Sequence, residues 1–169
     1  MLQLKRFFTT ATAVLLLASC GGSKNEGTLL VSKIDEAVAA VAEVLQTQPK
    51  FYEINATPTL VNLFADDGKG NAINFVYNGE KLEEATAVAP ADGTSFEASD
   101  FVFEDAILEN VEKELPESTI RAFTLTADGV KDAVTYRVVI QSDLGGQFAV
   151  LVDPAGKILG SDPLDAPEL

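Results

Sequence analysis

Hydrophobic residues recur with helical spacing soon after residue 28. They follow one another at steps of four, three and four, which places their side chains on one face of a helix. The residues on that face are Ile34, Val38, Val41 and Leu45. We expect an amphipathic helix over residues 32–48, with a capping arrangement of Ser32 and Asp35 at its start and Pro49 at its end.

Short segments rich in aromatic and β-branched residues follow this helix and are separated by turn-forming residues, which predicts strands. They cover residues 51–56, 59–65 and 72–77. The second half has the same order, with a predicted helix over residues 103–115 that ends at Pro116. Its predicted strands are 119–126, 134–142 and 147–152, and the alternation of apolar and polar residues in the middle one is typical of a sheet with one buried face.

Each half finishes with a strand, a glycine turn, a charged residue and an aliphatic residue, at residues 74–82 and 149–159. Because the elements recur in one order, we interpret the chain as an internal repeat. This predicts an α+β fold of two helix-plus-antiparallel-sheet repeats, with the helices on one face and the other face exposed for binding. The repeats either sit side by side or share one continuous sheet. The expected boundaries are 28–89 for the first repeat, 90–99 for the connection and 100–165 for the second repeat.

The N-terminus has the layout of a secretory signal peptide. Lys5 and Arg6 precede an uncharged, mostly apolar run over residues 7–19. That run is too short for a stable transmembrane helix, which needs about 20 apolar residues. We therefore expect residues 1–19 to be removed as a signal peptide.

The end of this segment resembles the bacterial lipobox, in which an aliphatic residue and two small residues precede the cysteine that receives a lipid. The matching residues are Leu17, Ala18, Ser19 and Cys20. The resemblance implies lipid on Cys20, and two or more acyl chains suffice for stable membrane anchoring. The glycine-rich, polar residues 20–27 would form a flexible tether. The alternative is an ordinary signal peptide in which Cys20 is incidental.

These features predict a lipid-anchored protein of the cell envelope. Gly21 rather than aspartate follows Cys20, so in a Gram-negative cell we expect the outer membrane, facing the periplasm, or the cell surface. The chain carries a formal charge of −14, and removal of Lys5 and Arg6 with the signal peptide would make it two units more negative. Such a charge disfavours nucleic acid and anionic lipid headgroups as partners. A basic protein, divalent cations or simple solubility remain as explanations.

The composition removes most familiar catalytic chemistry. The chain contains no histidine, and Cys20 is the single cysteine. Histidine-dependent nucleophile systems, histidine zinc sites and internal disulfides are therefore excluded. No carboxylate pair is singled out by its spacing, so we predict a protein that is not an enzyme and that uses no cofactor.

Two acidic segments are candidate binding sites. Asp66 and Asp67 could offer oxygens to a metal ion, but residues 66–71 lack the spacing of an EF-hand loop and fit a hairpin turn. The second acidic segment lies on and just after the second predicted helix, as a docking patch for a basic partner or as a solvated face. It contains Glu104, Asp105, Glu109, Glu112, Glu114 and Glu117.

Residues 103–116, 135–140 and 152–159 together resemble the PepSY-like family. Its pattern is a helix ending in proline, a strand with Tyr-x-Val, and a last strand with an Asp-x-x-Gly-x-Ile/Leu turn. The first half matches loosely, with residues 61–63 in place of the tyrosine strand. Tandem units of this kind resemble the architecture of beta-lactamase-inhibitory proteins. The resemblance implies fold first, and by analogy restraint of a peptidase or hydrolase.

The leading functional hypothesis is a non-catalytic envelope lipoprotein that binds another protein or peptide through its exposed sheet face. The membrane would be a partner through the lipid on Cys20, and nucleic acid is not expected as a partner. The alternative is a carrier of a small apolar ligand or of divalent cations.

Overall fold

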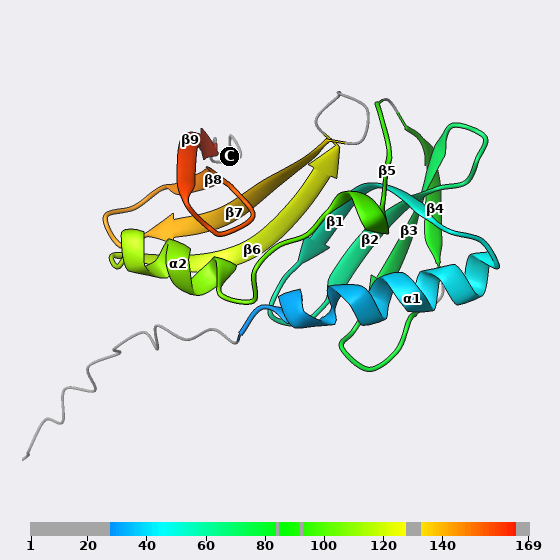
Figure 1. Ribbon diagram of the computed structural model, residues 1–169, viewed down its shortest axis with the longest axis horizontal. Coiled ribbons are helices and arrows are strands. Elements are labelled where there is room, and N and C mark those ends of the chain that lie inside the picture. The colour runs from blue at the N-terminus through cyan, green and yellow to red at the C-terminus, as the bar shows by residue number, and fades with distance from the viewer. Residues whose placement is uncertain (1–27, 84, 92, 128–132, 165–169) are drawn as a thin grey trace, which may run out of the picture.

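The computed structural model describes residues 28–83, 85–91, 93–127 and 133–164. In this part of the chain a long helix, a short helix and nine strands follow one another (Figure 1). The helical elements are η1 (Leu30–Lys33), α1 (Ile34–Leu45), η2 (Ala98–Asp100) and α2 (Ile107–Glu114). The strands are β1 (Lys50–Ala56), β2 (Val61–Asp66), β3 (Asn71–Tyr77), β4 (Thr86–Pro90), β5 (Phe96–Glu97), β6 (Ser118–Ala127), β7 (Val134–Ser142), β8 (Gln147–Val152) and β9 (Ile158–Leu164).

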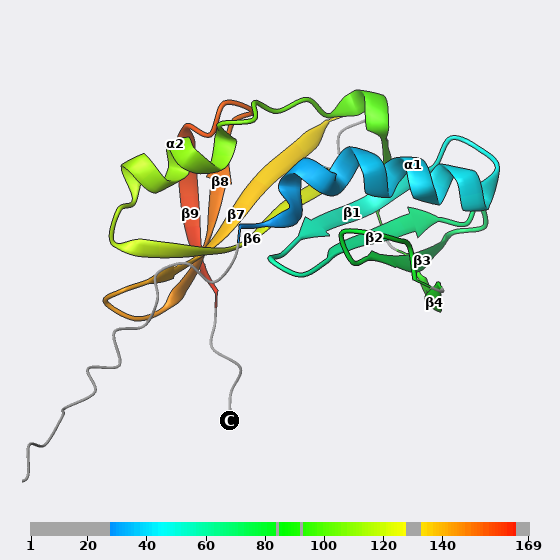
Figure 2. The same ribbon diagram turned by 90° about the horizontal axis from the view of Figure 1, so that it is seen from below.

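All nine strands belong to one antiparallel sheet. Its order is β4-β3-β2-β1-β6-β7-β8-β9, and β5 pairs with β1 beside this path. The two halves of the chain meet where β1 pairs with β6, with Ile54 opposite Leu125 and Ala56 opposite Phe123. Both helices lie on the same side of this sheet (Figure 2).

The prediction of two helix-plus-sheet repeats is wrong. The β1–β6 ladder joins all the strands into a single sheet, and η1 with α1 is twice as long as α2. Hydrophobic residues of both helices and of both halves of the sheet also pack into one core. A continuous ladder satisfies the backbone groups of β1 and β6 that would otherwise lie at two separate sheet edges.

The helix α1 packs its predicted apolar face against the sheet, and Ile34, Val38 and Val41 are buried. The predicted capping arrangement of Ser32 and Asp35 is absent, because Lys33 occupies the cap position and no side chain accepts a hydrogen bond there. The helix ends at Leu45 because Gln46 adopts a left-handed conformation with φ of 54°.

The second helix is shorter than the pattern predicts. Its apolar residues Ile107 and Val111 are buried, but the helix begins only at Ile107 instead of residue 103. The residues before it form an extended strap whose Phe101 and Phe103 continue a chain of aromatic contacts. No helix among the described residues is long and apolar enough to cross a membrane.

Candidate functional site

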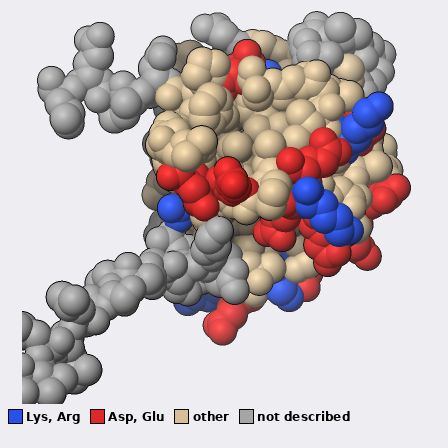
Figure 3. Space-filling model, turned by 90° about the vertical axis from the view of Figure 1, so that its left-hand side faces the viewer, with Lys and Arg blue, Asp and Glu red and all other residues tan. Residues whose placement is uncertain are grey.

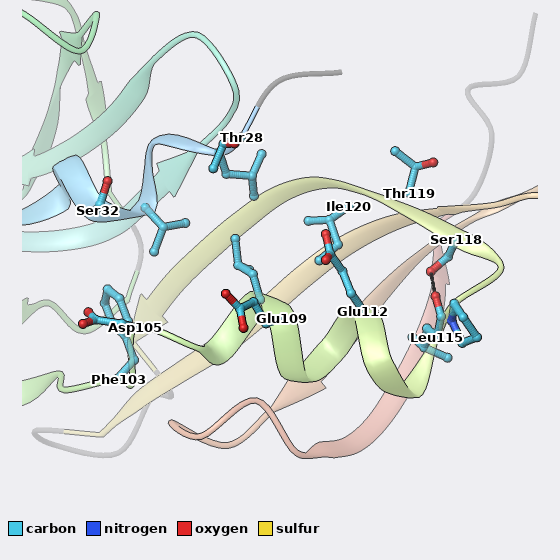
Figure 4. Close-up of a pocket in the computed structure, with 14 residues that line it drawn as sticks. Thr28, Ser32, Phe103, Asp105, Glu109, Glu112, Leu115, Ser118, Thr119 and Ile120 are labelled. Carbon is cyan, nitrogen blue, oxygen red and sulfur yellow. Dashed lines mark hydrogen bonds between the residues drawn. The ribbon is translucent and has the colours of Figure 1, made fainter. Parts of the chain in front are cut away.

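A groove of about 950 Å³ lies between the N-terminal turn, α2 and the start of β6 (Figure 4). We call it the acidic groove. Its lining comprises Thr28, Leu29, Val31 and Ser32 from the N-terminal turn, Phe103 and Asp105 from the strap, Leu108, Glu109 and Glu112 from α2, and Leu115, Pro116, Ser118, Thr119 and Ile120 around the start of β6.

The N-terminal wall is fixed to the body of the protein. Leu29 and Val31 are buried in the core, and the backbone N–H of Leu30 donates to the carbonyl of Thr57 at 2.9 Å. Thr28 and Ser32 stay exposed on the groove side. This wall therefore combines buried anchors with small polar groups at its surface.

The opposite wall, α2, is held by the turn between β8 and β9. The side chain of Asn110 donates to the carbonyl of Ala155 at 2.8 Å, and the backbone N–H of Glu104 donates to the carbonyl of Pro154 at 2.9 Å. Gly156 approaches so closely that a Cβ built there would lie 2.3 Å from the Ile107 carbonyl oxygen. The helix is thus pinned through its N-terminal half.

Aromatic packing fixes the strap that leads into α2. Ring centroids lie 6.0 Å apart for Phe96 and Phe101, 6.2 Å for Phe101 and Phe103, and 5.2 Å for Phe103 and Phe123. The hydroxyl of buried Tyr136 also donates to the carbonyl of Val102 at 3.1 Å and accepts from its N–H at 3.2 Å. Phe103 is therefore presented to the groove by a rigid segment.

The groove has charge of one sign over an apolar floor. Asp105, Glu109 and Glu112 are exposed, and none of the described lining residues is Lys or Arg. Figure 4 shows Glu109 and Glu112 pointing from α2 into the space below Thr28. The one lysine of α2, Lys113, instead contacts the Asn110 side-chain oxygen at 3.4 Å.

The helix dipole acts differently on the two groove carboxylates of α2. It lies in the last turn of α2, where the helix macrodipole disfavours a negative charge. Glu109, in contrast, lies in the first turn, where a carboxylate stabilises the helix. Glu114, outside the acidic groove, lies in the same last turn and is disfavoured in the same way.

The acidic segment that the sequence offers as a solvated face or a docking patch is split between two hollows. Asp105, Glu109 and Glu112 line the acidic groove, whereas Glu114 and Glu117 border a second hollow beyond the end of α2. The sequence pattern places the charge correctly on α2. It gives no sign of the apolar floor, because Leu29 and Ile120 come from distant segments and meet there only through the sheet.

Asp66 and Asp67 form a hairpin turn between β2 and β3. Asp66 accepts from the N–H of Gly68 at 2.8 Å, and Asp67 accepts from the Asn71 side chain at 2.7 Å. The hydrogen bond from Asn71 lowers the pKa of Asp67. Among the described residues no group of three or more His, Cys, Asp or Glu is placed to hold a metal ion.

The sheet face away from the helices, here called the open face, was the binding surface expected from sequence. On the described strands β1–β3 and β6–β8 its only acidic residues are Glu53 and Asp66. Asn55 donates to Thr124 at 3.2 Å and burial raises the pKa of Glu53, whereas the side-chain oxygens of Asn55 and Asn74 are buried without a hydrogen-bond partner among the described residues. The open face therefore lacks the concentrated charge of the acidic groove.

The predicted lipidation site, Cys20 with Leu17, Ala18 and Ser19, lies outside the described residues. The described chain begins at Thr28, which itself lines the acidic groove. The groove is therefore separated by only residues 21–27 from the cysteine that the sequence predicts to carry lipid.

Comparison with known proteins identifies the fold. The chain is similar to the crystal structure of a candidate lipoprotein from Clostridium difficile 630, with a TM-score of 0.60 and 13% sequence identity over 77% of this chain and 91% of that chain. No protein-family model matches the chain, and no curated protein matches it. The PepSY-like resemblance therefore stays a prediction from sequence, while the likeness to the clostridial structure shows a shared fold.

Proposed function

We propose that this protein is a lipid-anchored, non-catalytic binding module of a bacterial cell envelope that captures a basic segment of another protein in the acidic groove. The observation that carries the proposal is the groove itself. It combines about 950 Å³ of space, an apolar floor and three carboxylates with no basic residue among its described lining. A segment with Lys or Arg beside apolar side chains complements both features.

The envelope location has separate support. Residues 17–20 resemble a lipobox, and the structurally similar clostridial protein is itself described as a candidate lipoprotein. With lipid on Cys20, the short tether would hold the groove near the membrane surface. A partner at the same surface would then be bound at a raised effective concentration.

The absence of histidine from the sequence supports a role without catalysis. The resemblance to the PepSY-like family makes an envelope peptidase or hydrolase a class of partner to test first. The proposal places the contact in the acidic groove, not on the open face, because the groove concentrates the charge that a basic segment would recognise.

The test measures binding of a labelled peptide of alternating Lys and Gly to the chain without its signal peptide and with Cys20→Ser, by fluorescence anisotropy. Exchange of Glu109 and Glu112 for Gln removes two groove carboxylates. Surface ion pairs contribute about 0.2–1 kcal/mol each, so this variant should bind roughly 2- to 30-fold more weakly at low salt.

The matched control exchanges Asp35 for Asn and Glu43 for Gln, which removes the same charge from exposed positions on α1 outside the groove. We expect this control to bind almost as tightly as the parent, and high salt to weaken every interaction. Equal losses in the two variants would mean that net charge alone attracts the peptide, and the groove would be rejected as the site.

A further inference from the structure

A second hollow lies beyond the C-terminal end of α2, where the short helix stops before it covers the sheet. We call it the end pocket. It has a volume of about 480 Å³, and its lining is mostly apolar, with Leu115 and Pro116 from the end of α2, Ile140 from β7, Phe148 and Val150 from β8, and Ile158 from β9.

The end pocket adjoins the acidic groove. The two hollows share Leu115, Pro116 and Ser118, so only the turn between α2 and β6 separates them. A single extended segment that lies in the groove and passes over this turn reaches the end pocket. The two hollows are therefore placed to act on one ligand.

The border of the end pocket identifies the chemistry of that ligand. Glu114 and Glu117 line its edge, beside Ser142 and Ser161. A fatty acid or phospholipid would bring its own negative group against these carboxylates, which is unfavourable. Figure 3 shows that this end of the molecule has an uncharged surface bordered by Asp and Glu side chains, with Lys or Arg side chains among them. An apolar side chain flanked by Lys or Arg would pack in the apolar interior, and its basic neighbours would pair with the carboxylates at the border.

We propose that the end pocket receives one large apolar side chain, aliphatic or aromatic, of the same basic segment that occupies the acidic groove. This inference rests on the proposed function and adds sequence specificity to it: basic residues fill the groove, and a neighbouring Phe, Leu or similar residue fills the pocket. Leu144, which is 90% exposed on the turn between β7 and β8, lies near the pocket residue Ser142, whose hydroxyl accepts from the Leu144 N–H at 3.2 Å.

The test compares two labelled Lys/Gly peptides that differ only in one position, Phe in one and Ala in the other. Burial of a Phe side chain should tighten binding to the parent protein about tenfold or more. Ser161→Phe fills the pocket from its exposed edge and should abolish the preference for Phe while leaving the Ala peptide bound as before. Ser99→Phe, the same exchange at an exposed position outside both hollows, should keep the preference.

The outcomes separate the two proposals. Equal affinity of the parent for both peptides overturns the end-pocket assignment and leaves binding in the groove intact. Failure of both peptides to bind overturns the proposed function and, with it, this inference. Binding of oleate that Ser161→Phe abolishes, without any preference for the Phe peptide, would replace the assignment with an apolar-ligand site.

Discussion

Gly156→Ala tests whether the turn between β8 and β9 positions α2 and thereby shapes the acidic groove. Gly156 is buried and has φ of +85°, a backbone conformation that disfavours residues with a Cβ. An added Cβ would lie 2.3 Å from the Ile107 carbonyl oxygen and 3.1 Å from the Asn110 Cβ. The backbone of α2 cannot yield without losing its packing, so the helix or the turn must move.

The expected loss of folding stability in Gly156→Ala has two contributions, and a matched variant separates them. The left-handed conformation costs a non-glycine residue about 1–2 kcal/mol, and forced overpacking costs about 1–3 kcal/mol more. Gly70 has the same φ of +85°, but a Cβ added there would meet no atom within 4 Å, so Gly70→Ala should show only the first part. We expect Gly156→Ala to be the less stable variant by about 1–3 kcal/mol.

The assay is urea unfolding followed by circular dichroism, with melting temperature as a second measurement. For a chain of this size the difference between the variants corresponds to roughly 2–12 °C in Tm. Gly156→Ala should also weaken binding of the Lys peptide, whereas Gly70→Ala should not. Equal stability of the two variants would refute the close packing of α2 on this turn.

Three further predictions concern single side chains. Glu112→Gln should stabilise the free protein by about 0.3–1 kcal/mol, seen as a higher Tm, while weakening peptide binding. Burial raises the pKa of Glu53, so the folded protein favours the neutral carboxyl, and this stability is lost as pH rises through that pKa. Glu53→Gln should therefore raise Tm at pH 7 but not near pH 4. Tyr136→Phe should lower stability by about 1–3 kcal/mol in urea unfolding, because it leaves the Val102 backbone groups without their partner. Burial raises the pKa of Tyr136, so its contribution is present below about pH 10 and the difference between parent and variant should shrink above it.

Local pattern was sufficient to predict the first helix and six of the strands within a few residues. Those segments have strong apolar periodicity or alternation, as in β7, where Tyr136, Val138 and Ile140 face the core. β9 was not predicted because Gly160, Asp162 and Pro163 interrupt its apolar residues, and β4 was not predicted because most of its residues are small and show no alternation of apolar and polar side chains. Both are edge strands of the sheet, and their pairing with β8 and β3 compensates for weak local propensity.

The arrangement of the two halves could not be predicted from such patterns. Pairing of β1 with β6 joins segments about 70 residues apart. Neither strand carries a local signal that shows whether it pairs with a strand of its own half of the chain or of the other half. The acidic groove depends on this pairing, because it sets the N-terminal turn beside β6. The sequence therefore predicts the acidic residues of the site but not its apolar floor.

The shortness of α2 explains why there is a site at all. Eight helical residues rise about 12 Å, whereas the ten residues of β6, the strand that α2 contacts, extend about 33 Å, so α2 is less than half as long as that strand. A helix over residues 103–115, as the sequence predicts, would be about 20 Å long and would cover more of the sheet. Instead, the strap holds Phe103 by aromatic packing and Leu115 leaves the helix before Pro116, and both residues line the acidic groove. The departure from the predicted helix therefore creates the apolar surface that the proposed function requires.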